Sequence, residues 1–440
     1  MCFVCNNNNK EEAKNTLMRK VYLPAAAALC GAATIVLLSA AEGPAALPRV
    51  QFEGEATKIA AGKSPKILTR RQHGMFVVYS KPSGERGADL WMQTTPDLGD
   101  SFTDPIRVND IAGEVSDHGE NSAQLLGSPG ERELYVVWNA RDPKQPSGSL
   151  IRFAKSDGMN VRFGPAVTLN DDNLPVSHSF QGAAVGPDGA IYVAWLDGRE
   201  RASGKNMEGT SAIYLARSTD GGKTWSKNLR VAGNVCPCCR ASIGFAKGNV
   251  IVAWRGVEKG DLRDITIAVS ADKGETWSAP KVAARDGWRM NGCPHVGPAL
   301  ASIGDTLALS WFTEANDQPS VYYAESRDGG VTFTPKRKIS DNAVDPTHPA
   351  LVTDGKKFGV VFQARAEGSE KRWGKFVTYY REILPGGIAA PLVRAGEGKA
   401  NAVYPAAALG FSGRVFLAWS ETTAEGTSSY LLRGRPSTGR

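Results

Sequence analysis

Three cysteines are crowded into the segment VCPCCRAS, at Cys236, Cys238 and Cys239, and Arg240 follows them directly. The chain has 440 residues and only seven cysteines, so the cluster is unusual. Clustered thiolates bind soft metal ions such as copper or zinc, and in an oxidising compartment they form disulfides instead. Because Cys-x-Cys-Cys is not a common zinc spacing, we favour disulfides. Copper or zinc bound by these thiolates and His295 is the alternative.

The expected disulfide partner is Cys293, in the segment NGCPHVGPA. A bond between the adjacent residues Cys238 and Cys239 would be strained, because neighbouring Cα atoms lie closer together than most disulfides prefer. A bridge from Cys293 to Cys236 or Cys239 is the more natural choice. Four cysteines allow three complete pairings, so the sequence leaves the pairing open.

Histidines, acidic residues and a tyrosine form a second group that could do chemistry. Four of the five histidines stand at the beginning of short apolar segments. Imidazole binds metal ions, or it donates hydrogen bonds and protons to a ligand, and carboxyl groups serve as acids and bases. The group consists of Asp117, His118, Glu120, His178, His295, His348 and Tyr404. Whether these residues meet depends on the fold.

A short β-type segment ending in an aromatic residue recurs about every 57 residues, which indicates a repeat architecture. The copies are MFVVY at 75–79, LYVVW at 134–138, IYVAW at 191–195, VIVAW at 250–254, LALSW at 307–311, FGVVF at 358–362 and VFLAW at 415–419. An apolar segment of small residues precedes each copy, and a further strand-like segment follows it. Most units close with a fourth, more polar strand.

Four antiparallel strands repeated at this interval are the blades of a β-propeller, so we predict an all-β fold. Dividing residues 42–440 by the repeat length favours seven blades over the alternative of six. The last unit ends without a closing strand, and the segment 48–60 is available to supply it. Pairing the two ends of the chain would remove an open sheet edge.

Four units carry the pattern Ser/Thr-x-Asp-x-Gly-x-Thr/Ser-aromatic after their third strand. The copies are TPDLGDSF at 95–102, STDGGKTW at 218–225, SADKGETW at 270–277 and SRDGGVTF at 326–333. An aspartate in a tight turn accepts backbone N–H bonds, and glycine supplies a positive φ. We therefore expect these aspartates to hold turns and to take no part in chemistry; they are Asp97, Asp220, Asp272 and Asp328.

This pattern resembles the Asp-box, or bacterial neuraminidase repeat, of the sialidase superfamily. In a four-stranded blade, the turns between strands three and four lie on one face, and the segments that enter strand one lie on the other. The Asp-boxes therefore mark one face of the propeller. The histidine and cysteine segments precede first strands, so we expect them around the channel mouth on the opposite face.

The resemblance implies a sialidase-like glycoside hydrolase that uses a tyrosine nucleophile. By position, Tyr404 would be the nucleophile, Glu120 or Asp117 the acid and base, and Arg240 the group that binds a substrate carboxylate. The Arg-Ile-Pro signature of sialidases is absent, and the equivalent strand at 64–71 reads SPKILTRR. The alternative function is a non-catalytic propeller that binds a glycan, a peptide or a metal ion at the same rim.

The expected ligand-binding rim combines strand entries with the long loops between second and third strands. Its members are His118, His178, Arg240, Arg255, His295, His348 and Arg365. We expect a carbohydrate or another small ligand there, with no cofactor required for its binding. The net charge of +7 is spread along the chain without a basic cluster, so nucleic acid is not expected as a partner. We expect a monomer.

The N-terminal region has the features of an export signal. The tripeptide Met18-Arg19-Lys20 precedes an uncharged apolar stretch at 21–41 that ends in small residues. We interpret residues 1–41 as an extension and signal peptide, with translation starting at Met18, and 42–440 as a single propeller domain. This predicts a secreted or periplasmic protein without a membrane span after cleavage. An uncleaved anchor is the alternative.

Overall fold

The computed structural model describes residues 47–437 apart from residues 48, 71–73, 86, 131, 159–160, 202–203, 206–208, 367–373, 397, 399 and 411. These residues belong to one compact unit, Ala46–Arg440. The expected signal segment 1–41, including Met18, lies outside the described residues. Within the described part of the chain, no helix is long and apolar enough to cross a membrane.

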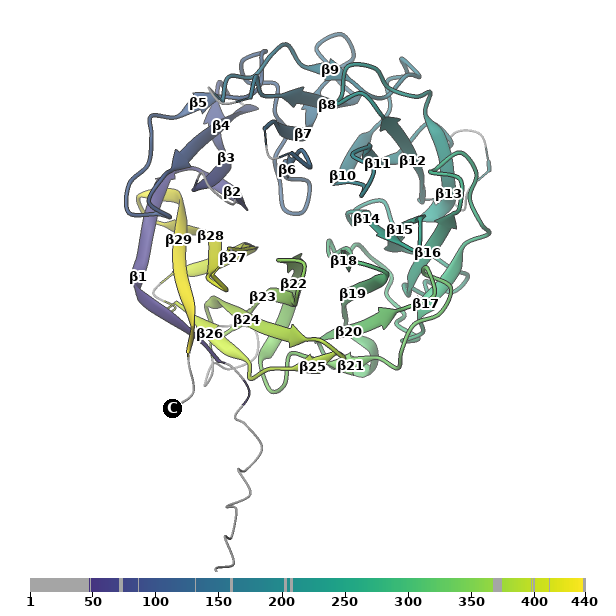
Figure 1. The fold of residues 1–440 in the computed structure, drawn as a ribbon. Helices are drawn as coiled ribbons and strands as arrows, with labels where there is room; N and C mark the ends of the chain where they lie inside the picture. The colour runs from purple at the N-terminus through teal and green to yellow at the C-terminus, as the bar shows by residue number, and fades with distance from the viewer. Residues whose placement is uncertain are drawn as a thin grey trace, which may run out of the picture. The chain divides into compact units, whose positions relative to one another are not determined.

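Seven antiparallel sheets follow one another around a ring (Figure 1). The first blade contains β2 (Lys63–Thr69), β3 (Met75–Ser83), β4 (Gly87–Thr95) and β5 (Ile106–Arg107). The second contains β6 (Gln124–Gly127), β7 (Leu134–Arg141), β8 (Ser149–Lys155) and β9 (Val167–Thr168). The third contains β10 (His178–Val185), β11 (Ile191–Asp197), β12 (Ser211–Ser218) and β13 (Leu229–Val235). The fourth contains β14 (Ser242–Ala246), β15 (Asn249–Arg255), β16 (Ile265–Ser270) and β17 (Lys281–Ala284).

The remaining blades keep this order. The fifth contains β18 (Ala299–Ile303), β19 (Thr306–Thr313), β20 (Ser320–Ser326) and β21 (Arg337–Lys338), with the 3-10 turn η1 (Ala315–Asp317) between β19 and β20. The sixth contains β22 (Val344–Thr353), β23 (Phe358–Arg365), β24 (Phe376–Leu384), β25 (Ile388–Ala389) and β26 (Val393–Ala395). The seventh contains β27 (Asn401–Leu409), β28 (Val415–Thr423), β29 (Gly426–Ser437) and β1 (Arg49–Ala61). The prediction of seven four-stranded blades is confirmed, with the fourth strand of the sixth blade divided into β25 and β26, which both pair with β24.

The two ends of the described chain close the ring within one sheet. Strand β1 pairs antiparallel with β29, from Arg49 opposite Ser437 to Ala61 opposite Ser428. Figure 1 shows β1 as the outermost strand of the sheet that also holds β27 and β28. The expectation that the N-terminal segment supplies the missing strand is therefore confirmed.

The aromatic residue that ends each repeat copy packs between neighbouring blades. All seven are at most 2% exposed: Tyr79, Trp138, Trp195, Trp254, Trp311, Phe362 and Trp419. Trp254 of β15, for example, shares a cluster with Ile213 and Leu215 of the preceding blade. Aromatic side chains of this size remove a large apolar area from water. Each copy of the repeated segment in the sequence therefore supplies one aromatic residue to the hydrophobic core between two blades.

The Asp-box turns are held together by their own carboxylates. In the third blade, Oδ1 of Asp220 accepts hydrogen bonds from the Ser218 hydroxyl at 2.8 Å and from the N–H groups of Lys223 and Thr224 at 3.0 and 2.9 Å. The equivalent bonds form at Asp97, Asp272 and Asp328. The hydrogen bond from the Thr276 side chain lowers the pKa of Asp272 to about 2.

Glycine is required in these turns where they meet the next blade. Gly222 has a φ of +82°, and a Cβ atom at this position would lie 2.4 Å from the ring of Phe153 in the second blade. Only glycine combines this backbone conformation with so close a contact. The turn thus serves the packing between blades.

Candidate functional site

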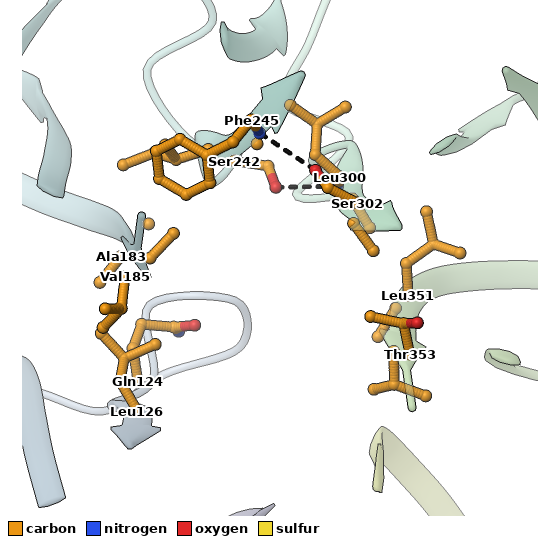
Figure 2. Close-up of a pocket in the computed structure, with 18 of the residues that line it drawn as sticks. Gln124, Leu126, Ala183, Val185, Ser242, Phe245, Leu300, Ser302, Leu351 and Thr353 are labelled. Carbon is orange, nitrogen blue, oxygen red and sulfur yellow. Dashed lines mark hydrogen bonds between the residues drawn. The ribbon is translucent and has the colours of Figure 1, made fainter. Parts of the chain in front are cut away.

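The first strands of the seven blades line a central channel with a cavity volume of about 1360 Å³. Figure 2 shows side chains of this wall, among them Leu126 and Phe245. The Ser242 hydroxyl oxygen accepts a hydrogen bond from the Leu300 N–H at 2.9 Å, and Ser302 accepts one from the Phe245 N–H at 3.0 Å. These bonds tie the first strands of the fourth and fifth blades, β14 and β18, to each other.

Polar and charged side chains gather at the end of the channel where the first strands begin. Lys66, Glu120, Arg240, His348 and Tyr404 line it. They come from the first, second, fourth, sixth and seventh blades, respectively. Each lies before its blade's first strand or in the first half of it, so the strand direction of a propeller brings them together.

Glu120 ties three loops together at this end. The side chain is 6% exposed, and its Oε2 atom accepts hydrogen bonds from the N–H groups of Gly297 at 2.6 Å and Arg240 at 3.2 Å. A Cβ atom at Gly297 would lie 2.1 Å from the carbonyl oxygen of Arg240. The fifth-blade loop therefore lies against the fourth-blade loop, and Glu120 of the second blade closes over both.

Asp117 lies in the same loop as Glu120 and is held by the first blade. Its carboxylate accepts hydrogen bonds from the hydroxyl groups of Ser64, at 3.0 Å, and Ser80. Its carbonyl oxygen accepts one from Lys63 Nζ at 2.7 Å. Burial raises the pKa of the Asp117 carboxyl, against the lowering effect of these hydroxyl groups and of the nearby lysines.

Tyr404 and His348 pack edge to face, with ring centroids 5.0 Å apart. Both have a positive φ, 54° and 55°, and each lies where the pairing of its strand shifts register, as at a β-bulge. A Cβ atom at Gly119 would lie 3.2 Å from the Tyr404 hydroxyl oxygen, so this hydroxyl lies beside the segment that carries Glu120. Burial raises the pKa of Tyr404, and the charges of Glu120 and Asp117 raise it further.

Lys66 completes the polar end of the channel. The pKa of Lys66 is lowered to about 8, because burial and, to a smaller extent, Arg240 outweigh the raising effect of Asp117 and Glu120. Lys66 was not among the site residues predicted from the sequence. Lys66 lies in β2, the first strand of the first blade. The expectation that residues near the start of a first strand surround the channel mouth, which was applied to the other six blades, would have included it.

His178 is enclosed by the fold and does not reach the rim, so its assignment to the ligand-binding rim is corrected. It is fully buried. Its Nδ1 atom lies 2.6 Å from the Ser149 carbonyl oxygen, and its Nε2 atom lies 3.1 Å from the Asp172 carboxylate. Both partners only accept hydrogen bonds, so both ring nitrogens donate. Burial lowers the pKa of His178, but the bond to Asp172 and the charge of Asp197 outweigh it, and the pKa is raised. The residue supports the contact between the second and third blades.

Arg255 is also a structural residue, and its assignment to the rim is corrected for the same reason. The side chain is 1% exposed. It donates hydrogen bonds to the carbonyl oxygens of Val296, Arg263 and Phe312 at 3.1, 2.8 and 2.8 Å, and its guanidinium lies 4.9 Å from the centroid of the Trp288 ring. Three of its five N–H donors are thus bonded to the backbone, and its burial keeps the guanidinium away from a ligand at the rim.

The other rim residues remain near the surface. His118 and His295 are exposed, and the His118 ring meets Phe180 edge to face at 5.9 Å. Burial of part of the ring lowers the pKa of His118, and the Asp117 carboxylate opposes this. Arg365 is half-buried, with Nε 2.8 Å from Asp345 Oδ2.

The clustered cysteines are buried between the third and fourth blades. The Sγ atom of Cys236 lies 3.5 Å from those of Cys238 and Cys239, which are 3.9 Å from each other. Hydrogen bonds from Cys238 and then Cys239 lower the pKa of Cys236. The exposed Cys293 has its sulfur within 4.8 Å of Cys238 and of a ring nitrogen of His295. All four cysteines are free.

The expected disulfides are therefore not formed among the described residues. A disulfide requires sulfur atoms about 2.05 Å apart, and the three buried sulfur atoms lie well beyond this distance from one another. They face one another as a cluster instead of pairing.

A family model described as the BNR/Asp-box repeat matches residues 216–227, which contain the Asp220 turn. The same turn chemistry recurs at Asp97, Asp272 and Asp328, within a ring of seven antiparallel sheets. The chain is a BNR/Asp-box repeat β-propeller. No curated protein matches this propeller in sequence.

Solved structures share the fold of this BNR/Asp-box propeller at low sequence identity. An ulvan lyase of polysaccharide lyase family PL25 is 13% identical, with a TM-score of 0.54, and the match covers 87% of this chain and 96% of the lyase. An intramolecular trans-sialidase from Ruminococcus gnavus is 13% identical over 90% of this chain and 98% of its own, with a TM-score of 0.43. An α-L-arabinofuranosidase of family GH93 from Fusarium graminearum is 12% identical over 73% and 96%, with a TM-score of 0.45. At this identity, the likeness to the ulvan lyase shows the propeller fold alone.

Proposed function

We propose that the protein is an exported glycoside hydrolase of the sialidase type that acts on a glycan bearing a carboxylate group. The observation that supports this most strongly is the meeting of Lys66, Glu120, Arg240 and Tyr404, from four different blades, at one end of the channel. Sialidases attack their substrate with a tyrosine, and here a tyrosine hydroxyl lies beside a segment with two carboxyl groups. The neighbouring lysine and arginine suit an anionic sugar.

The proposed reaction proceeds through a glycosyl–tyrosine intermediate. The Tyr404 oxygen attacks the anomeric carbon while its proton passes to Glu120, and Asp117 protonates the oxygen of the leaving group as the glycosidic bond breaks. Water then attacks the same carbon and gives a proton to Asp117. Tyr404 leaves and takes back its proton from Glu120. Each acid is thus restored at the end of the cycle.

The electrostatics of the acidic groups support these roles. Burial and the neighbouring carboxylates raise the pKa of Tyr404, so the resting residue is a neutral phenol that needs a base when it attacks. Burial raises the pKa of Asp117, which favours the protonated form that a proton donor needs.

The two cations supply a site for the substrate carboxylate. Arg240 and Lys66 line the same end of the channel. They lie close enough together for the positive charge of Arg240 to lower the pKa of Lys66. A bound carboxylate between them would relieve this repulsion. Arginine and carboxylate also match as a bidentate hydrogen-bonded pair, so an acidic glycan should bind more tightly than its neutral counterpart.

A panel of acidic glycans tests the proposal. The panel contains α-linked sialosides, uronic acid oligosaccharides and -[GlcA(1-4)Rha3S]-, which the ulvan lyase of the same fold was solved with, together with neutral sugars as controls. The expected result is release of a new reducing end from an acidic glycan. An unsaturated sugar as the product would show that the glycan is cleaved by elimination and not by hydrolysis. Binding of acidic glycans without any turnover would leave the alternative function, glycan recognition, and would overturn the catalytic assignment.

A further inference from the structure

The buried cysteine cluster is not used by the proposed glycan site. Cys236, Cys238 and Cys239 are at most 5% exposed and belong to the apolar cluster between the third and fourth blades. Their side chains nevertheless point toward one another, with sulfur–sulfur distances of 3.5, 3.5 and 3.9 Å. Three polarizable groups from one short loop are thus directed at a common point.

These distances are those of thiolates that share a metal ion. With metal–sulfur bonds of about 2.3 Å, two ligand sulfur atoms lie about 3.8 Å apart at tetrahedral angles and about 4.0 Å apart around a three-coordinate ion. The observed separations lie within about 0.5 Å of these values, whereas a disulfide needs about 2.05 Å. The loop therefore holds the three sulfur atoms near the geometry of a metal–thiolate centre without any of them being bonded to another.

The surroundings of the cluster are cationic. Arg263 Nη1 donates a hydrogen bond to Cys236 Sγ at 3.5 Å, and the Cys236 N–H donates to the carbonyl oxygen of Arg255 at 3.0 Å. The buried guanidinium of Arg255 bonds to neutral carbonyl groups, and a buried charge needs compensation nearby. A monovalent metal ion with three thiolates carries a net charge of about −2, which the guanidinium of Arg255, together with that of Arg263, itself paired with Asp261 at 3.5 Å, would partly balance.

We propose that Cys236, Cys238 and Cys239 bind one Cu(I) ion. Thiolate ligands select soft ions, chiefly Cu(I) and zinc, and a structural zinc site requires four ligands. The ligand atoms of Cys293 and His295 lie within 4.8 Å of the Cys238 sulfur. With Cys238 they form a second group of possible ligands, which does not include Cys236 or Cys239. They do not complete a four-ligand set around the buried trio, so the geometry favours Cu(I) over zinc.

A bound ion would fix the loop that leads into the candidate glycan site. Arg240 follows Cys239 directly, and its N–H donates to Glu120 at 3.2 Å. The metal site would thus position Arg240, while remaining distinct from the groups assigned to substrate. The copper proposal does not depend on the hydrolase proposal, and its test uses no glycan.

Competition with a coloured chelator tests the site directly. The full chain is purified without oxygen, stripped of metal and titrated with Cu(I) in the presence of bicinchoninate, and in parallel with Zn(II) alone against a chromophoric zinc chelator. We expect one Cu(I) per chain to be withdrawn from bicinchoninate, with zinc held less tightly. X-ray absorption of the copper-loaded wild type should show three sulfur ligands. This measurement needs no variant and so remains decisive if the variants fail to fold.

Two variants separate the trio from the exposed cysteine. Cys238→Ser should lose the retained copper, whereas Cys293→Ser should retain one Cu(I). Arg263→Gln should weaken Cu(I) affinity by about 10–100-fold, since it removes a group that touches a ligand sulfur. No transfer of copper from bicinchoninate, tighter retention of zinc than of copper, a disulfide within the trio of the isolated protein, or unchanged copper binding in Cys238→Ser would each overturn the proposal.

Discussion

The Oε2 atom of Glu120 lies 2.6 Å from the N–H of Gly297, and this hydrogen bond joins the second blade to the fifth. Figure 1 shows these blades on different sides of the ring, with the loop before β6 reaching inward from the second blade. The same carboxylate oxygen accepts the N–H of Arg240. A single side chain therefore sets the relative positions of three loops at the polar end of the channel.

Removing this acceptor should destabilise the fold as well as the site. Glu120→Ala leaves two backbone N–H groups without their partner, and we expect the free energy of unfolding to fall by about 1–3 kcal/mol. Glu120→Gln keeps an acceptor oxygen and should cost less than about 1 kcal/mol. Denaturant unfolding of both variants measures the difference. Equal losses in the two would show that the negative charge, and not the acceptor, holds the loops.

Lys66 makes stability depend on pH in the alkaline range. Its pKa is lowered from 10.5 in the unfolded chain to about 8 in the fold, chiefly by burial. Between these values the unfolded chain binds the additional proton, so stability should rise as the pH increases from about 8 to about 10. In Lys66→Met this part of the rise should be absent. Unfolding measured across that range in both proteins checks the sign, and parallel curves would contradict it.

Tyr404→Phe separates catalysis from binding. If the phenol is the nucleophile, its removal should lower kcat on the acidic glycan found in the panel by at least about 100-fold. Glycan affinity should change little, because Arg240 and Lys66 remain. Tyr322→Phe, on the third strand of the fifth blade, is the matched control and should keep full activity. Turnover in Tyr404→Phe at the wild-type rate would exclude the proposed mechanism.

The fold was predictable because the segments that form the hydrophobic core recur at a regular interval in the sequence. Each copy of the β-type segment ends in an aromatic residue that packs between blades, as Trp254 does, and so the copies count the blades. The Asp-box turns were predictable for a similar reason, since their carboxylates bond within the same few residues, as Asp220 does. Local chemistry of this kind can be inferred from the sequence.

The side chains of the rim were less predictable, because position in a strand does not determine burial. His178 and Arg255 stand at expected places, yet carboxylates and carbonyl groups from other segments enclose them. Several of those partners are distant in sequence: Ser149 lies 29 residues from His178, and Phe312 lies 57 residues from Arg255. The state of the cysteines likewise depends on the distances between their sulfur atoms, such as the 3.5 Å between Cys236 and Cys238, and the positions of the cysteines in the sequence do not determine these distances.

The processing of the N-terminus remains a prediction from the sequence. The basic residues Arg19 and Lys20, the apolar stretch 21–41 and the small residues before Glu42 predict cleavage after Ala41. Intact mass of protein exported by its own signal should correspond to a chain that begins at Glu42. Replacing Ala41 with a bulky residue should block this cleavage. A mass that includes residues 21–41 would instead indicate a retained anchor.

Closure of the ring by β1 should be essential for a soluble monomer. Its residues Arg49–Ala61 pair with β29 along most of their length, so a chain that begins at Lys63 would leave β29 as an unpaired edge. Exposed edges pair with other chains, and we expect this truncated protein to aggregate and to unfold more easily. A chain that begins at Leu47 is the matched control and should behave as the untruncated domain does. Addition of a peptide with the sequence 49–61 should restore the monomer, because it replaces the missing hydrogen bonds. Light scattering and denaturant unfolding measure both effects, and a monomeric Lys63 truncation with unchanged stability would show that the first blade closes the ring without this strand.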